Sequence, residues 1–207
     1  MIGLTGGIAS GKSTVTNRLR ELGAFVADAD AVSREAIDLP EAKARILDKF
    51  GADVFLEDGS VSRPALAEKA FSSPEATALL NSILHPVIAA RLIELTNDAS
   101  REYPLVFTDA ALLIESGFDR LCEGVWLVTA NTETRIQRIM ERDGLTREQA
   151  QLRIARQMPD EEKRAYASVV IENDGTLEDL IKRVDAAYRN ELFGTSELEE
   201  IRDAYED

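Results

Sequence analysis

The sequence predicts an α/β fold in which a five-stranded parallel sheet carries helices on both faces. Along most of the 207 residues, short apolar runs alternate with longer segments of helical periodicity, which is the pattern of parallel strands joined by crossover helices. The first apolar run, residues 1–5, leads into a glycine-rich turn at residues 6–13, and an amphipathic segment follows it. This strand–loop–helix order at the N-terminus is the main basis for the predicted fold.

The glycine-rich turn reads Gly-Gly-Ile-Ala-Ser-Gly-Lys-Ser, which matches the phosphate-binding P-loop pattern G-x-x-x-x-G-K-S. Its glycines let the backbone turn sharply and aim N–H groups at phosphate oxygens. The helix that begins there adds the positive end of its dipole. In such a loop Lys12 reaches the terminal phosphates and the Ser13 hydroxyl binds Mg²⁺. An ordinary glycine-rich turn is the alternative. The residues expected to contact the nucleotide are Ala9, Ser10, Gly11, Lys12, Ser13 and Thr14.

Composition and charge argue against several classes of protein. The net charge of −14 disfavours nucleic acid as a general partner, because binding to its backbone needs a basic surface, and it disfavours anionic membranes. No apolar run approaches transmembrane length, and the N-terminus lacks a signal-peptide pattern. Cys122 is the only cysteine, so it can form neither an intrachain disulfide nor a cysteine metal site. We expect a cytoplasmic monomer or weak homo-oligomer that binds neither nucleic acid nor membrane.

Carboxylates follow the second predicted strand, residues 25–28. The strand ends in Asp28-Ala29-Asp30, and residues 31–37 continue as a helix. Ligands of open α/β sheets bind beyond the carboxyl ends of the strands, so Asp28 and Asp30 are candidate site residues. For each of them, and more so for Asp28, capping of the helix is the alternative.

The next segment, about residues 40–100, is predicted to be largely helical. It is long for a simple crossover between strands, so we expect an inserted helical subdomain that holds the second substrate. Pro86 lies in the longest apolar helical pattern and should mark a kink or break, because proline lacks an amide donor. His85, the only histidine, is either a packed or capping residue or a contact to phosphate or substrate.

Three further strands are predicted, at residues 104–109, 124–129 and 169–171. The first is apolar almost throughout, as a buried parallel strand is, and it ends in Asp109. In a typical P-loop sheet this acid lies beside the loop and serves Mg²⁺; alternatively it only closes the strand. Trp126 is expected to be a packing residue. Asn173-Asp174-Gly175 follows the last strand, and Thr176 caps a final helix through Tyr188.

An arginine-rich helical pair is predicted at about residues 132–165. Thr132 is expected to cap its first helix, residues 133–142, whose arginines lie near one face because they are three and four residues apart: Arg135, Arg138 and Arg142. Gly144 breaks this helix, and Thr146 with Gln149 forms a capping box for the next one. The pair is typical of a lid that closes basic groups over phosphates. Because glutamates are interspersed, a solvated surface helix is the alternative.

These elements predict one domain over residues 1–190, followed by an acidic tail at residues 191–207. The tail contains seven acids and one arginine. Ile201 and Tyr205 within it predict a short amphipathic turn or helix. No chemistry is assigned to the tail.

As a whole the residues resemble the dephospho-coenzyme A kinase family, over nearly all of the chain up to about Ile181. Two segments make the resemblance specific: residues 80–86, which read L-N-x-I-x-H-P, and residues 109–115, which read D-x-x-L-L-x-E. The other segments that match the family are residues 2–8, Asp28-Ala29-Asp30 with Arg34, Phe50-Gly51-Ala52, Asp58-Gly59 with Arg63, Glu133-Thr134 with Arg138, Arg142-Asp143, Gln157, and Asn173 with Gly175.

The resemblance implies a P-loop kinase fold with a helical acceptor-binding insert and a helical lid. The implied reaction is ATP-dependent phosphorylation of the 3′-hydroxyl of dephospho-coenzyme A, which gives coenzyme A and ADP and is the final step of coenzyme A biosynthesis. Such a transfer depends on positioning and on charge neutralisation more than on covalent chemistry.

The resemblance also implies roles for individual residues. Asp30 would orient or deprotonate the attacking hydroxyl. The developing charge would be neutralised by Lys12, by Mg²⁺ on Ser13, and by Arg138 and Arg142. The residues implied to contact the acceptor are Asp30, Arg34, His85 and Leu112, and those implied on the adenine side of the nucleotide are Asn173 and Gly175.

At four positions the chain departs from the family pattern: Ala9 for Gly, Ala111 for Pro, Arg135 where Gln is common, and Ser168 for Asp. Alanine at residue 9 predicts that this loop position does not need a positive φ angle. Arg135 is expected to alter the charge of the lid. None of the departures removes a residue on which the implied chemistry depends.

Three other readings stay open. Another small-molecule P-loop kinase, acting on a nucleoside monophosphate or a metabolite, would differ mainly in the insert and in the acids after the second strand. A nucleotide-switch protein is the second. A GTPase of this kind would normally carry the guanine-binding tetrapeptide N-K-x-D, and this tetrapeptide does not occur in the sequence. A structural domain without a ligand is the third, and the intact Gly11-Lys12-Ser13 argues against it.

Overall fold

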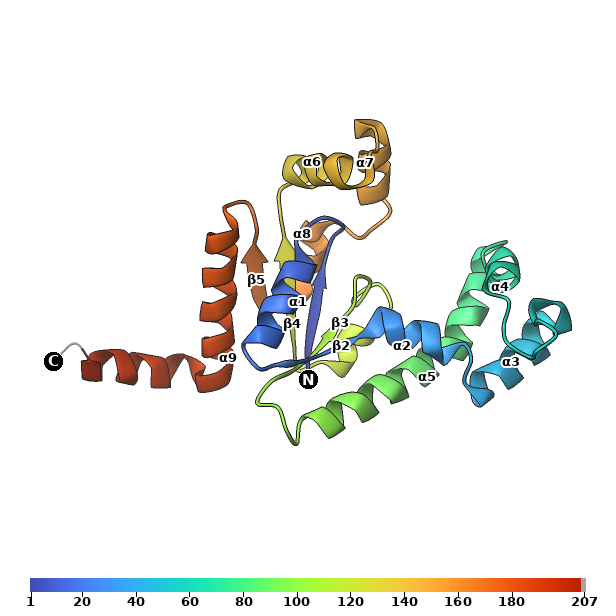
Figure 1. The fold of residues 1–207 in the computed structure, drawn as a ribbon, viewed down its shortest axis with the longest axis horizontal. Helices are drawn as coiled ribbons and strands as arrows, with labels where there is room; N and C mark the ends of the chain where they lie inside the picture. Colours follow the sequence, from blue (N-terminus) through green and yellow to red (C-terminus); the bar gives the residue numbers. More distant parts are fainter. Residues whose placement is uncertain (206–207) are drawn as a thin grey trace. The chain divides into compact units, whose positions relative to one another are not determined.

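The computed structural model describes residues 1–205 of the chain, with side chains through Gly194 (Figure 1). The chain divides into two compact units. The first, called the sheet unit here, contains Met1–Ala27 and the chain from Thr96 onward; the second, called the helical unit, is Asp28–Leu95. The helical unit therefore begins before residue 40, where the insert was expected to start.

Five strands form one sheet in the order β2-β3-β1-β4-β5, which confirms the predicted fold class. The strands are β1 (Ile2–Gly6), β2 (Phe25–Asp28), β3 (Val106–Asp109), β4 (Gly124–Thr129) and β5 (Val169–Glu172). β1 is central and pairs in parallel with both neighbours, so that Leu4 lies opposite Asp109 and Trp126. Every residue of β1 is buried, as expected for a central parallel strand. The loop that leaves β1 is thus fixed at the middle of the carboxyl edge of the sheet.

Side chains of β1 alternate between the two faces of the sheet. On one face Leu4 belongs to a core shared with α1 (Lys12–Glu21) and α9 (Leu177–Tyr205), which lie side by side (Figure 1). The rings of Phe107 and Trp126 meet edge-to-face in this core, with their centroids 5.1 Å apart, which confirms Trp126 as a packing residue. The two helices contribute Val15, Leu19, Leu180, Val184 and Tyr188.

On the opposite face, Gly3 leaves no room for a side chain. A Cβ at residue 3 would fall 2.4 Å from Leu113 and 3.0 Å from the Cys122 sulfur. These two residues flank η2 (Phe118–Leu121) in the segment after β3, so that segment packs closely on the sheet. Cys122 is partly buried, and burial raises the pKa of its thiol to about 11, in keeping with the small apolar role expected for it.

α9 is longer than the helix that the sequence predicted to end at Tyr188. Its backbone is helical from Leu177 to Tyr205 except at Gly194, where φ is 70° and ψ is 158°. The predicted start is confirmed, since the Thr176 hydroxyl accepts a hydrogen bond from the Asp179 amide (3.1 Å). The expected amphipathic contribution of Ile201 and Tyr205 concerns side chains outside the described residues.

The helical unit contains α2 (Ala29–Ala36), α3 (Pro40–Phe50), η1 (Ala52–Val54), α4 (Arg63–Ala70) and most of α5 (Pro74–Ala99). Of the kink or break predicted at Pro86, the break is wrong, because α5 continues through it. Pro86 cannot donate to the Ser82 carbonyl, but both residues are exposed, so water can satisfy that carbonyl. Elsewhere the helix is held by buried residues: Leu80, Ile83, Leu84, Ile88 and Leu92.

By length and mean hydropathy, α5 is also the one helix among residues 1–205 that could cross a bilayer. The helix meets this criterion without a continuous apolar run, because polar residues such as Asn81, Ser82 and Arg91 lie among its apolar ones. A single helix of this kind is weak evidence for a membrane, since a helix in the core of a soluble protein passes the same test.

Candidate active site

The P-loop leaves β1 at Gly6 and ends where α1 begins at Lys12. Gly11 has a φ of 98°, and a Cβ there would fall 2.1 Å from the side-chain nitrogen of Asn173, so only glycine fits. Ala9 also has a positive φ, 62°, which contradicts the expectation drawn from an alanine at this position. The left-handed conformation costs an alanine roughly 1–2 kcal/mol, so neighbouring contacts must hold it.

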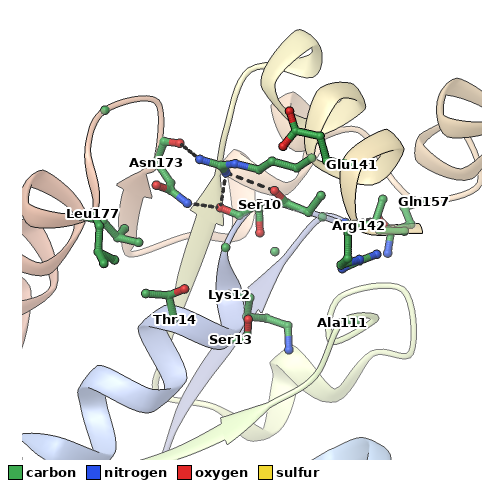
Figure 2. A pocket seen from close by; sticks show the side chains of 18 residues that line it. Ser10, Lys12, Ser13, Thr14, Ala111, Glu141, Arg142, Gln157, Asn173 and Leu177 are labelled. Atoms are coloured by element: carbon green, nitrogen blue, oxygen red, sulfur yellow. Dashed lines mark hydrogen bonds between the residues drawn. The ribbon is translucent and has the colours of Figure 1, made fainter. Parts of the chain in front are cut away.

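Side-chain donors bind three successive carbonyl oxygens of the P-loop, those of residues 8, 9 and 10. The pairs are Arg135 Nε with Ile8 (2.9 Å), Arg138 Nη1 with Ala9 (3.2 Å) and Asn173 Nδ2 with Ser10 (2.7 Å). Figure 2 shows Asn173 and Ser10 joined in this way at the edge of the site. The first amides of a helix lack an intrahelical partner as a rule; here the Thr14 amide already donates to the Gly11 carbonyl (3.0 Å), which leaves those of Lys12 and Ser13. With the carbonyl oxygens already bound, the loop can present its N–H groups to an anion.

The P-loop lines a cavity of about 800 Å³ within the sheet unit, a size that suits a nucleotide. Predicted site residues from distant parts of the chain line it together with the loop: Arg138, Arg142, Asn173 and Gly175. Figure 2 labels Arg142 and Asn173 among them. Glu141 and Leu177 line it as well, although the sequence did not single them out. The cavity therefore gathers most of the residues predicted for the nucleotide site.

Asp109 lies beside the P-loop, at the end of β3, as predicted. Lys12 makes an ion pair with Asp109, and the Thr16 hydroxyl donates to the other carboxylate oxygen (2.6 Å). Lys12 and Asp109 side chains are only 20% and 13% exposed, so the pair is largely shielded from water. The contact of Thr16 with Asp109 was not predicted, because in the sequence Thr16 is only a polar residue of a predicted helix.

The helix after β4, α6 (Thr132–Asp143), is capped by Asn131 and not by Thr132. The Asn131 side chain accepts a hydrogen bond from the Thr134 amide (2.8 Å), and Asp174 holds the Asn131 amide in turn (2.7 Å). The end at Gly144, in a left-handed conformation, and the capping box that starts α7 (Arg147–Ile154) are both as predicted.

The three arginines of α6 have different surroundings. Arg138 lines the cavity and also donates to the Asn173 carbonyl (3.1 Å). Arg142 lines the cavity too, but its side chain is 58% exposed and pairs with Asp143 (2.7 Å). Arg135 is buried behind the P-loop, with 5% exposure. The expectation that Arg135 alters the charge of a lid is therefore wrong.

These surroundings predict different effects for the two arginines of the cavity. Arg142→Ala should slow phosphoryl transfer about 10²-fold, the usual effect of removing one donor to a developing charge, and should leave nucleotide affinity nearly unchanged. Arg138→Ala should slow transfer and also weaken binding, because it frees the Ala9 and Asn173 carbonyls. Single-turnover rates and calorimetry with ADP separate the two effects.

Arg153→Ala is a matched control for Arg142→Ala. Arg153 pairs with the same carboxylate, that of Asp143 (2.7 Å), and lies outside the residues that line the cavity. It should leave transfer unchanged. If Arg142→Ala also keeps full turnover at saturating substrates, Arg142 contributes only surface charge.

The acceptor-side residues implied by the resemblance lie mostly in the helical unit. Asp28 caps α2 by accepting a hydrogen bond from the Ala31 amide (2.9 Å). The capping role that was the alternative for this residue is therefore observed. Asp30 is exposed in the first turn of α2, and Arg34 lies 4.0 Å from Asp28. His85 on α5 is partly buried, and this burial lowers its pKa. Leu112, in the sheet unit, is half-exposed.

An ion pair with a buried lysine, which the sequence did not reveal, lies in the segment after α7. Lys163 ends α8 (Asp160–Lys163), is fully buried, and pairs with Glu115 (2.9 Å). It lies 3.4 Å from the carbonyl of Ala111, on the cavity wall, and Glu115 also accepts from the Met158 amide (3.2 Å). The sequence of α8, Asp-Glu-Glu-Lys, is typical of a solvated helix and does not indicate a buried lysine. The only signal in the sequence was that Glu115 matches the final acid of the D-x-x-L-L-x-E segment.

Removing Lys163 should strongly destabilise the protein. Lys163→Met leaves the Glu115 carboxylate without its counter-charge. Breaking a fully buried pair costs about 3–5 kcal/mol, and we expect a loss below that range because the Glu115 side chain is 22% exposed. Adding Glu115→Gln should restore part of the loss, because no unpaired charge then remains. The free energy of unfolding in urea measures both. Lys182→Met, which breaks an exposed pair with Glu178, is the control and should cost less than about 1 kcal/mol. Equal losses in the two lysine variants would contradict this prediction.

Known proteins resemble this chain in both sequence and structure. The family model described as dephospho-CoA kinase (CoaE) matches residues 1–179. The dephospho-CoA kinase of Geobacter metallireducens is 43% identical over 198 residues, which cover 93% of this chain and 96% of that protein. A crystal structure of a Thermus thermophilus protein aligns with a TM-score of 0.75 at 42% identity, covering 92% of this chain and 96% of that one. The dephospho-CoA kinase of Campylobacter jejuni aligns with a TM-score of 0.69 at 26% identity, covering 91% and 95%.

Proposed function

Because this chain belongs to the dephospho-CoA kinase family, we propose that it transfers the γ-phosphoryl group of ATP to the 3′-hydroxyl of dephospho-coenzyme A. The products are coenzyme A and ADP, and the reaction is the final step of coenzyme A biosynthesis. The observation that carries the proposal is the agreement between the family match over residues 1–179 and the P-loop cavity, whose lining residues all fall in that range except Leu180.

The nucleotide side of the reaction is assigned to the cavity of the sheet unit. The loop amides and Lys12 would bind the phosphates, and Asn173 with Gly175 would lie on the adenine side. Ser13 and Asp109 would hold Mg²⁺, since a hydroxyl and a carboxylate are the hard oxygen ligands that this ion prefers; the ion, when bound, neutralises charge on the phosphates. Arg138 and Arg142 would stabilise the charge on the transferred group.

The acceptor side is assigned chiefly to the helical unit. The Asp30 carboxylate is exposed just after the end of β2, where it could take the proton of the 3′-hydroxyl. The hydroxyl oxygen then forms a bond to the γ-phosphorus as the bond from that phosphorus to ADP breaks. Arg34 and His85 from the same unit, and Leu112 from the loop after β3, would contact the acceptor.

We also propose a cytoplasmic enzyme that is a monomer or weak homo-oligomer and has no nucleic-acid or membrane partner. The support is the net charge of −14, which repels polyanions and anionic lipids, together with the one partly buried cysteine, which needs no oxidising compartment. Gel filtration and cell fractionation test these assignments.

The decisive experiment mixes the purified protein with ATP, Mg²⁺ and dephospho-coenzyme A and detects coenzyme A directly. Parallel reactions contain a nucleoside monophosphate or no acceptor. Coenzyme A formation that requires the added acceptor supports the proposal. Transfer to the monophosphate instead would favour another small-molecule kinase, and binding of nucleotide without any transfer would favour a switch protein.

A further inference from the structure

Arg135 is the one arginine that is buried in the part of the chain with described side chains. Its guanidinium lies against the P-loop backbone at Gly7, where a Cβ would fall 2.3 Å from Nη2. Its Nε donates to the Ile8 carbonyl (2.9 Å). A buried guanidinium pressed against the loop fixes backbone position and needs a counter-charge, because burying an unpaired charge is costly.

Asp160, the first residue of α8, supplies that charge. Its Oδ1 lies 3.1 Å from Arg135 Nη1, and the two side chains are 12% and 6% exposed. Its Oδ2 accepts a hydrogen bond from the Thr129 hydroxyl (2.6 Å). Thr129 is the last residue of β4, which pairs with β1. A chain of contacts therefore joins the end of β4 through Asp160 and Arg135 to the Ile8 carbonyl.

The Ile8 peptide is held from its other side as well. Its amide donates to Gln157 Oε1 (2.7 Å), three residues before Asp160 in the sequence. Ile8 precedes Ala9, whose φ of 62° is unfavourable for an alanine. Fixing the amide and the carbonyl of the preceding residue prevents the relaxation of Ala9 to a more favourable conformation.

We propose that Arg135 and Asp160 are positioning residues that hold the P-loop in its phosphate-binding conformation before the nucleotide arrives. Neither residue lines the P-loop cavity; the ion pair acts through the Ile8 carbonyl. The proposal rests on the proposed function only in taking ATP as the nucleotide. The buried charge of Arg135 makes the carboxylate at residue 160 necessary.

The test compares Arg135→Gln, Asp160→Asn and the double variant. Each single variant should weaken ADP–Mg²⁺ binding, measured by calorimetry, and raise KM for ATP about ten- to a hundredfold, because a charge-assisted contact is lost and one charge stays buried without a partner. KM for dephospho-coenzyme A should change less than about threefold. The fold-loss of ADP affinity in the double variant should be smaller than the product of the two single fold-losses, because the two amide side chains leave no buried charge.

Arg18→Gln separates this role from a general effect on stability. Arg18 makes a bidentate pair with Asp185 (2.7 and 2.8 Å) between α1 and α9. Its loss should lower the unfolding midpoint and leave KM for ATP unchanged. Unchanged ADP binding in Asp160→Asn, or equal changes in the KM values of both substrates, would overturn the proposal.

Thr129→Val keeps the test available if the charge variants fail to fold. It removes only the hydroxyl that orients Asp160, and it should weaken ADP binding at least about threefold, whereas Thr129→Ser should restore wild-type binding. Equal binding by the two variants would overturn the proposal. Failure of the proposed function can be told apart from failure of this proposal. In the first case the wild-type protein forms no coenzyme A, and the ADP measurements still test the Arg135–Asp160 pair.

Discussion

Lys12→Ala should lose nearly all phosphoryl transfer and keep the fold. No other side chain matches the P-loop lysine, whose charge lies where the β- and γ-phosphates bind. Removing one preorganised donor to developing charge costs about 10²–10³ in turnover, and we expect a loss at or above that range. In the structure Lys12 pairs with Asp109, so the variant leaves a largely shielded carboxylate without its counter-charge and should be less stable. Thr16 still donates to that carboxylate, and we expect the fold to persist at this lower stability.

The measurement is steady-state formation of coenzyme A, with circular dichroism and thermal unfolding as the check on folding. Lys49→Ala, in an exposed position on α3, is the matched control and should turn over at the wild-type rate. Near wild-type activity of a folded Lys12→Ala protein would refute the P-loop assignment and, with it, the nucleotide site.

Asp30→Asn should reduce turnover by roughly 10²–10⁴, the usual contribution of a positioned general base. The side chain lies just beyond the carboxyl end of β2, at the edge where open α/β sheets bind ligands. Asparagine is nearly isosteric with aspartate but cannot accept the proton of the attacking hydroxyl. Nucleotide affinity should change little, because the loop amides and Lys12 still bind the phosphates.

Asp28→Asn is the internal control for this prediction. Asp28 caps α2 through the Ala31 amide, and asparagine caps equally well, so the loss of turnover should be smaller than in Asp30→Asn. Transfer to dephospho-coenzyme A and calorimetry with ADP are measured side by side. If Asp30→Asn retains turnover, or loses nucleotide binding first, the carboxylate is a Mg²⁺ partner or a simple cap and not the base.

Features with a local signal were predictable from the sequence. The strand–loop–helix order at Lys12, the acid that ends β3, the capping box of Thr146 and Gln149, and the helix end at Gly144 all depend on residues within a few positions of one another. Alternation and periodicity of apolar residues were enough to place the strands, since each parallel strand is a short apolar run between helices.

The features that the sequence missed depend on distant partners. The positive φ of Ala9 is maintained by groups from α6 and from residue 157, which no local pattern connects to the loop. Arg135 and Lys163 read as surface charges because their counter-charges, Asp160 and Glu115, lie 25 and 48 positions away. The continuity of α5 through Pro86 depends on the exposure of one carbonyl, which sequence periodicity does not report.

The side chains that hold the P-loop also bear on the order in which the chain is made. The loop occupies residues 6–13, at the N-terminus, but the groups that bind its carbonyls and its Ile8 amide lie 127, 149 and 163 positions further along. A nascent chain emerging from a ribosome therefore carries the phosphate-binding residues long before it carries Arg135, Gln157 and Asn173. Until Asn173 has emerged and β5 has joined the sheet, the Ser10 carbonyl lacks its shorter hydrogen bond (2.7 Å) and has only the longer one from Arg138 (3.5 Å). We therefore expect nucleotide to stabilise the protein only once the chain is nearly complete.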